Sequence, residues 1–316
     1  MTQQNFYSLA LSKKELRKAK FLQTMNQVIP WDMLGDIVKP YYEKQPGVGR
    51  KKKPLKRMLK IICLQQWYNL SDPGVEEEIY DRSSFQEFLE VDLLDNSIPD
   101  ETTILNFRHL LEEHDLFDTM FERISLYLEE QGFKMTKGTI VDATIINAPT
   151  STKNKEKKRD PEMSSTKKRN QWYFGMKAHI GVDAHSGIVH SVTATTAKDH
   201  DIRQKNFLMD GREEAIFGDK AYLSIKRKQE ARELGIFFGI TEKRPKSGEV
   251  SVSQTKRNKQ LSSVRAKVEH PFQVIKCQWN YRKVRYRGIK KNLNQLRMLF
   301  TLFNLFKARH FLLSPA

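Results

Sequence analysis

The sequence predicts a mixed α/β fold, in which helices flank a central sheet and an all-helical region precedes it. The first part of the chain has apolar residues at helical spacing. Beyond Gly132, short β-branched or apolar runs alternate with helical stretches, which is typical of a mixed sheet. The 316 residues suffice for two domains. We place the division between residues 1–132 and 133–316.

Helix signals recur through the first part. Residues 55–70 are apolar over a length that predicts a buried helix, after the basic run GRKKKPLKR. Asp72 and Pro73 suit the N-cap and first position of a second helix. Residues 99–102 open another, and residues 116–131 form a further one.

The second part begins with a strand at residues 139–146, where TIVDATII is short and β-branched. Residues 149–168 are polar and basic without a hydrophobic period, so we expect a mobile loop. Residues 179–183 and 188–195 flank a turn with glycine and predict a hairpin. The remaining predicted elements are a short helix at 202–209, strands at 215–219 and 236–240, and helices at 224–234, 258–279 and 293–311.

Charge is strongly segregated along the chain. The 55 Lys and Arg exceed the 38 Asp and Glu, giving a net charge of +17. Residues 71–130 hold 18 acidic and three basic residues, so the rest of the chain carries +32. After Glu269, ten Lys or Arg follow and no acid does. This excess favours a polyanion, because neutralising phosphates releases counterions. Nucleic acid is the preferred partner, although charge alone does not separate DNA from RNA or anionic lipid.

Composition argues against several classes of protein. Cys63 and Cys277 lie far apart without metal-ligand spacing, which disfavours a disulfide scaffold and a zinc finger. No apolar run reaches the roughly 18 residues of a membrane span. The first residues lack the order of a signal peptide. We therefore expect a cytoplasmic protein with no membrane partner.

Three acidic residues are candidates for catalysis. Asp142 lies inside TIVDATII, and Asp219 ends the apolar run AIFGD. Aspartate is depleted from strands and costly to bury unpaired, yet each alone is explained more simply by a cap or turn role. Glu269 alone is explained by a surface ion pair with Lys267 or Arg265. Together the three acids fit two-metal phosphodiester cleavage, because Mg²⁺ needs only a few hard oxygen ligands.

The late helix provides a further test of Glu269. At about 100° per residue, Arg265, Glu269 and Lys276 fall within about 40° of one another. One helix face would then offer a carboxylate to metal ions and two cations to DNA phosphates. Pro271 opposes a regular helix because it removes a hydrogen bond and clashes one turn back. The helix either kinks there or begins near Glu269.

Several motifs resemble those of the DDE transposases of bacterial insertion sequences, most closely the insertion-sequence five family. They are VDATII, GDKAY and the series Arg265, Glu269 and Lys276, with 77 and then 50 residues between successive acids. The stretches LSDPGVEEEIYDRSSFQEFL and PDETTILNFRHLLEE are similar to that family's helical domain. The resemblance covers residues 59–312.

The resemblance implies an RNase H-like fold and cut-and-paste DNA transposition that depends on Mg²⁺ or Mn²⁺. We expect two such ions in the active site. It makes Asp142, Asp219 and Glu269 the catalytic and metal-binding triad, and Arg265 and Lys276 accessory basic residues. The partners would be double-stranded DNA, as terminal inverted repeats and as target. Pairing two DNA ends implies that the protein is a homodimer in the assembled complex. The resemblance also implies a bacterial protein that is cytoplasmic and associates with the nucleoid when it is bound to DNA.

The motifs differ from the family's pattern at one position and share a further pair of residues with it. Ser262 departs from the family's pattern, which often has a tyrosine three residues before the arginine. This tyrosine is not a metal ligand, so its absence concerns fine positioning. His200 and Asp201, in AKDHD, also occur in similar context in the family. Asp201 either caps a helix or belongs to the active site.

The path of the DNA is predicted from charge. The resemblance suggests residues 99–113 as a reading helix, but they lie in the acidic segment, so we prefer packing or dimerisation for residues 71–130. We therefore expect the DNA to contact residues 50–60, 153–177 and 282–291. The individual residues expected to bind DNA are Arg265, Lys276, Lys153, Lys158, Lys168, Arg282, Arg285 and Arg287.

Aromatic residues lie among these cations. Trp279, Tyr281 and Tyr286 either stack on bases or pack into the core, and Trp172 and Tyr173 pose the same choice. Two other functions stay open for the whole chain. A nuclease or resolvase on the same fold would cut without strand transfer, and a transposase-derived regulator would bind DNA with catalysis lost. The intact triad favours an enzyme.

Overall fold

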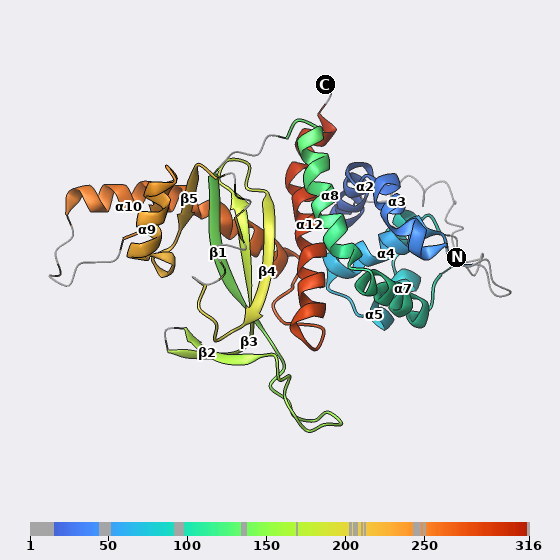
Figure 1. Ribbon diagram of the computed structural model, residues 1–316. Coiled ribbons are helices and arrows are strands. Elements are labelled where there is room, and N and C mark those ends of the chain that lie inside the picture. Colours follow the sequence, from blue (N-terminus) through green and yellow to red (C-terminus); the bar gives the residue numbers. More distant parts are fainter. Residues whose placement is uncertain are drawn as a thin grey trace, which may run out of the picture.

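The computed structural model describes residues 16–43, 52–91, 98–133 and 138–314, apart from residues 169, 202–203, 205–207, 210, 212, 243–247 and 249–250. A bundle of N-terminal helices packs on one side of a long C-terminal helix, and a six-stranded sheet lies on the other side (Figure 1). The mixed α/β class with a preceding helical region is confirmed.

The N-terminal helices surround α4. The described helices are α2 (Arg17–Val28), α3 (Trp31–Tyr42), α4 (Leu55–Tyr68), α5 (Asp72–Asp81), α6 (Ser83–Leu89), α7 (Glu101–Glu113) and α8 (Leu116–Glu130). Residues 58–67 of α4 are all buried, which explains their nearly continuous apolar sequence and confirms the predicted buried helix. The N-cap of α5 is Ser71, not Asp72, because the Ser71 hydroxyl accepts the Gly74 N–H at 3.1 Å.

The strands form one mixed sheet. They are β1 (Gly138–Asn147), β2 (Ser164–Lys168), β3 (Gln171–Asp183), β4 (Val189–Thr196), β5 (Ala215–Gly218) and β6 (Phe237–Ile240). Their order is β2-β3-β1-β5-β6, and β4 also pairs with β3. β5 runs parallel to β1 and to β6, whereas the other pairs are antiparallel. The central position of β1 places Asp142 deep in the sheet.

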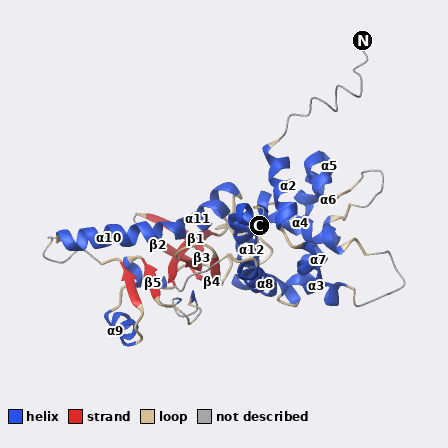
Figure 2. Cartoon of the chain, turned by 90° about the horizontal axis from the view of Figure 1, so that it is seen from above, coloured by secondary structure: helices blue, strands red, loops and turns tan. Residues whose placement is uncertain are grey.

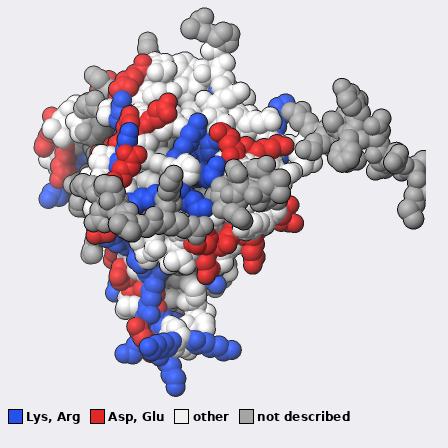
Figure 3. Space-filling model, turned by 90° about the vertical axis from the view of Figure 1, so that its right-hand side faces the viewer, with Lys and Arg blue, Asp and Glu red and all other residues white. Residues whose placement is uncertain are grey.

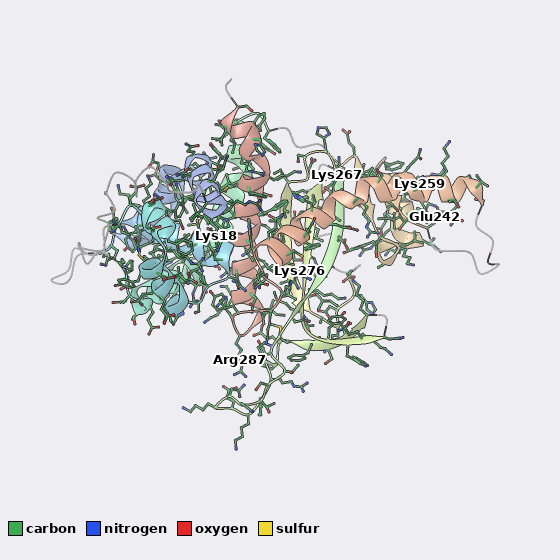
Figure 4. All side chains as sticks on the ribbon, turned by 180° about the vertical axis from the view of Figure 1, so that it is seen from behind. Lys18, Glu242, Lys259, Lys267, Lys276 and Arg287 are labelled. Atoms are coloured by element: carbon green, nitrogen blue, oxygen red, sulfur yellow. The ribbon has the colours of Figure 1, made fainter. Side chains whose placement is uncertain are left out.

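Helices cover the sheet from two sides. After β6, one helical run crosses behind the strands (Figure 4), made of α10 (Val252–Arg265), η4 (Ala266–Val268), α11 (Glu269–Gln273) and η5 (Val274–Gln278). The short α9 (Ile225–Glu233) connects β5 and β6. The long α12 (Ile289–Leu313) stands between β4 and the N-terminal helices (Figure 2). One cluster of buried apolar side chains continues from these helices through α12 to the sheet. The domain division near residue 132 therefore stays a prediction.

Three predicted elements differ from the structure. β2 lies at the end of the predicted mobile loop, and β3 begins at Gln171 rather than at residue 179. The two strands pair from Ser164 opposite Gly175 to Lys168 opposite Gln171, so backbone hydrogen bonds order a polar sequence without an apolar period. α10 begins at Val252, earlier than predicted. The helix predicted at 202–209 falls largely outside the described residues.

None of the described helices combines the length and the apolar composition that crossing a bilayer requires.

Candidate active site

Asp142 lies on β1, and Asp219 directly follows β5, the parallel neighbour of β1. β1 and β5 are paired up to Ile140 opposite Phe217. Two residues further along each chain, the two aspartates therefore stand level with each other. Asp219 follows β5 directly, and its Oδ1 accepts the Ala221 N–H at 2.7 Å, so it also caps a short 3-10 turn. The pairing of β1 with β5 thus brings two acids that are 77 positions apart in the sequence to the same edge of the sheet.

A cavity of about 430 Å³ opens where β1 continues past the end of β5. The acidic residues that line it are Asp142, Asp201, Asp219 and Glu269, and the basic ones are Lys167, Lys168, Lys177 and Arg265. The three acids predicted as a triad thus share one cavity, although they come from distant parts of the sequence. The lysines of the β2–β3 hairpin border the same space.

Glu269 enters the cavity from the helical run behind the sheet. Regular α-helix gives way to a 3-10 turn at η4, directly before Glu269, and to a π-helical turn at η5. Pro271 accounts for the first change, because it has no N–H to complete the bond one turn back. The Arg265 guanidinium lies 3.5 Å from the Glu269 carboxylate. Since the winding changes twice before Lys276, the uniform phase expected of an ideal helix does not apply.

Burial controls the charge of Asp142. The pKa of this carboxyl is raised from 3.8 to about 6, chiefly by burial and in part by the nearby Asp219 and Asp201 carboxylates. The Ala143 N–H, 2.8 Å from Oδ1, and the Arg265 guanidinium act in the opposite direction. Asp142 is therefore held in a site where a positive ion would be strongly favoured.

Lys276 lies where the helical run meets the sheet (Figure 4). Its ammonium donates to the Thr144 hydroxyl and to the Ile145 carbonyl, both at 2.7 Å. The Lys276 pKa is lowered from 10.5 to about 8, chiefly by burial and in part by the positive charges of Lys168 and Arg282. Lys276 therefore ties the π-helical turn to β1, beside the residues that line the cavity.

Lys177 and Asp201 extend the site beyond the three acids. The Lys177 ammonium lies 2.9 Å from Asp201 Oδ1 and donates to the Asp199 carbonyl at 2.6 Å. Both members of the ion pair line the cavity. The active-site alternative for Asp201 thus has direct geometric support. Lys177 was predicted only as the last residue of a DNA-contacting range, and its place beside the acids was not predicted. A charged residue inside the apolar run FGMKAHIGVD is the same signal that identified Asp142.

The loop between β1 and β2 projects from the lower end of the molecule, where Lys and Arg side chains gather (Figures 1 and 3). Its acids contact the start of α12. Asp160 and Glu162 each accept a backbone N–H there at 2.7 Å, and Glu156 pairs with Arg287 at 2.7 Å. Carboxylates at a helix N-terminus are favoured by its partial positive charge. The exposed lysines of this loop are Lys153, Lys155, Lys157 and Lys158.

The aromatic residues near the start of α12 pack inside the protein. Trp279 and Tyr281 are 4% and 1% exposed, so the packing alternative holds for both and base stacking does not. The Arg108 guanidinium lies 4.5 Å from the centre of the Tyr286 ring. Arg108 is buried and pairs with Asp72 and Glu112, both at 2.9 Å. The basic residue of the suggested reading helix is thus engaged within the protein.

Several cations predicted to bind DNA have protein partners. Arg285 donates to the side chain of Asn69 at 2.8 Å and to its carbonyl, and Arg282 donates to the Lys276 carbonyl at 3.0 Å. Lys60 is buried and pairs with a glutamate at 2.6 Å. Lys168, in contrast, is exposed at the cavity. Arg50 lies outside the described residues.

The donor chemistry of the cavity was tested against a divalent metal. Among the described residues, no group of three or more His, Cys, Asp or Glu side chains is close enough to hold a metal ion. Asp142 and Asp219 nevertheless suit a divalent metal ion, because their carboxylates are hard oxygen ligands and stand next to each other on the sheet. The two negative charges repel each other, and a cation between them would relieve that repulsion. Glu269 is held by Arg265. The residues thus suit Mg²⁺ or Mn²⁺ at the aspartates, with Glu269 available from the helix.

Comparison with known proteins gives consistent results. Residues 134–305, more than half of the chain, match the family described as "Transposase DDE domain". Residues 10–110 match "Transposase domain (DUF772)". The fold is similar to a solved structure described as a piggyBac transposase synaptic complex with hairpin DNA. The TM-score is 0.52 at 9% identity, over 93% of this chain and 75% of that one.

Proposed function

The chain belongs to the family of DDE transposases, and we propose that Asp142, Asp219 and Glu269 are its catalytic carboxylates. A transposase is a nucleotidyl transferase, which breaks one phosphodiester bond and forms another. In this protein the reaction would cut the transposon ends and then join each freed 3′ hydroxyl to target DNA. One observation carries the proposal: the two aspartates stand level on parallel strands, in one cavity with Glu269.

Asp142 and Asp219 would hold two divalent ions, either Mg²⁺ or Mn²⁺. Glu269 would complete the set of carboxylate ligands. Bound there, such ions activate the attacking hydroxyl or water and stabilise the leaving oxygen. The three carboxylates come from β1, from the residue directly after β5 and from the first residue of α11. Arg265, beside Glu269, and Lys276, beside β1, would face the backbone of the bound strand.

The proposed partners are the inverted repeats at the transposon ends and the target DNA. The similar piggyBac transposase was solved as a synaptic complex with hairpin DNA, which supports DNA as the partner here. We extend this to a homodimer, in which two copies bring two ends together. The exposed lysines of the β1–β2 loop and of the hairpin give the basic surface that such binding requires.

The triad is tested by strand cleavage. The substrate is DNA from both flanks of the coding region, chosen where short inverted repeats face each other. Asp142→Asn, Asp219→Asn and Glu269→Gln should each reduce cleavage in Mg²⁺ by at least about 100-fold, on the order of other essential catalytic groups, while DNA binding persists. Glu230→Gln, an acid of α9 with an exposed side chain, should cut normally, and EDTA should stop the wild-type reaction.

A second assay separates transposase from nuclease. Pre-cleaved ends are mixed with a supercoiled target plasmid, and joined products are counted. A transposase with this triad joins the ends, whereas a nuclease or resolvase without strand transfer does not. A silent regulator would bind the ends and neither cut nor join. Full cleavage by the Asp142→Asn variant would contradict the triad assignment.

A further inference from the structure

Trp172 is exposed to solvent, unlike the other tryptophans of the protein. Of the four tryptophans, Trp31, Trp67 and Trp279 are at most 7% exposed, whereas Trp172 is 68% exposed. A large aromatic side chain on the surface does not gain the free energy that burying its apolar area would give. Trp172 lies at the start of β3, near the tip of the β2–β3 hairpin, with Lys167 directly opposite on β2. It therefore combines a free aromatic face with a neighbouring cation.

The hairpin borders the candidate active site. Residues 166–168 of β2 line the cavity together with Asp142 and Asp219. Lys167, the residue paired with Trp172, is one of these lining residues, so Trp172 lies next to the wall of the cavity. The hairpin runs out from the sheet beneath β1 (Figure 1). A strand end held at the aspartates would therefore pass along the hairpin.

Several contacts hold the hairpin in place. A Cβ on Gly175 would lie 2.1 Å from the Ile146 carbonyl oxygen, so β3 lies tightly against the end of β1. The Arg159 guanidinium lies 5.4 Å from the Phe174 ring centre, and the Tyr173 hydroxyl donates within the hairpin at 2.8 Å. A preordered platform binds with less loss of entropy than a flexible one. These contacts therefore present Trp172 ready for a ligand.

We propose that Trp172 is a stacking platform for an unpaired nucleobase of the DNA end in the active site, with Lys167 and Lys168 contacting the adjoining phosphates. The proposal rests on the proposed transposase function and deepens it. Bases inside a duplex have both faces covered by neighbours, so an aromatic ring can stack only on a base freed at an end, nick or gap. Strand cleavage at the triad creates such ends. The surrounding lysines favour a nucleic acid over an apolar protein partner.

Binding without cutting tests this proposal. A short duplex with a single-stranded extension is compared with the blunt duplex in EDTA, so the result does not depend on which acids are catalytic. Trp172→Ala should weaken binding of the extended duplex by about 5- to 150-fold, the range of one base–aromatic stack, and leave the blunt duplex unchanged. Trp172→Phe should retain most of the affinity. Phe237→Ala, which removes another exposed aromatic of the sheet, is the matched control.

Fluorescence locates the contact. Because the other tryptophans are buried, quenching of the exposed emission by iodide should fall when the extended duplex binds, and this change should vanish in Trp172→Phe. A 2-aminopurine in the extension should be quenched by wild type and not by Trp172→Ala. Equal affinity of wild type and Trp172→Ala for the extended duplex would overturn the proposal. Equal losses on extended and blunt DNA would overturn it too, since Trp172 would then contact the duplex.

Discussion

Lys276 is a cation whose charge depends on pH near neutrality. Its pKa is lowered to about 8 by burial, whereas an unfolded lysine titrates near 10.5. We expect the single-turnover cleavage rate to fall as pH rises through about 8, because the positive charge beside the bound strand is lost. Lys276→Arg keeps its charge in this range and should remove that decline. The measurement is the cleavage rate in Mg²⁺ between about pH 7 and 9.

Stability should respond to Lys276 with the opposite sign. Between about pH 8 and 10.5 the unfolded chain binds the proton and the folded protein has lost it, so stability rises with pH in this window. In Lys276→Met this contribution should be absent from denaturant titrations. If Lys276→Arg shows the same alkaline decline in cleavage as the wild type, another group controls the rate.

At the scale of elements, Asn304 joins α12 to the sheet. Its side chain is fully buried, accepts the Val189 N–H at 2.9 Å and donates to the Val189 carbonyl at 2.7 Å. Asn304→Ala leaves two buried backbone groups unpaired, so we expect a loss of about 2 to 4 kcal/mol in the free energy of unfolding. Urea denaturation measures the change.

The control for Asn304 lies on the same helix. Lys290 pairs with Asp115 at 3.2 Å, and both side chains are more than half exposed. Lys290→Ala should cost less than about 1 kcal/mol, because exposed ion pairs contribute little. A loss as large as that of Asn304→Ala would mean that α12 depends on surface charge rather than on its buried amide.

Elements with an apolar pattern were predicted well, and paired polar strands were not. The TIVDATII strand and the buried α4 were identified because buried elements consist mostly of apolar residues, which are visible in the sequence. β2 and the first half of β3 were missed, since a ladder held by backbone hydrogen bonds needs no apolar period. The helical run through Pro271 was predicted to kink there or to begin near Glu269, and the 3-10 turn directly before Glu269 agrees with that effect of Pro271. The π-helical turn at η5 was not predicted.

At the scale of the whole molecule, charge should determine how tightly DNA binds. The β1–β2 loop carries exposed lysines at one end of the molecule (Figure 3). Replacing Lys153 and Lys158 with Ala should reduce the slope of log affinity against log salt by up to about 2, since each phosphate contact contributes about 0.9. Binding should weaken alike for every DNA sequence. Fluorescence anisotropy over a salt series measures this slope.

The matched variant replaces Lys226 and Lys228 of α9, whose side chains are 87% and 56% exposed, with Ala. Its salt slope should stay close to that of the wild type, because α9 lies away from the cavity residues. Equal effects of the two double variants would show that the basic charge acts as a diffuse field and not through the loop.

The sequence by itself determined the fold class, the three candidate acids and the preference for a polyanionic partner. Asp142, Asp219 and the polyanionic partner follow from local composition: an aspartate in or at the end of an apolar strand, and acids and bases sorted into different segments. Glu269 follows mainly from the resemblance of its motif to a known family. The tertiary structure decided which candidates can act together. It placed Asp142 level with Asp219, added Lys177 and Asp201 to the cavity, buried Trp279 and Tyr281, and left Trp172 exposed. The reason is physical, because burial and ion pairing depend on neighbours that are distant in the chain.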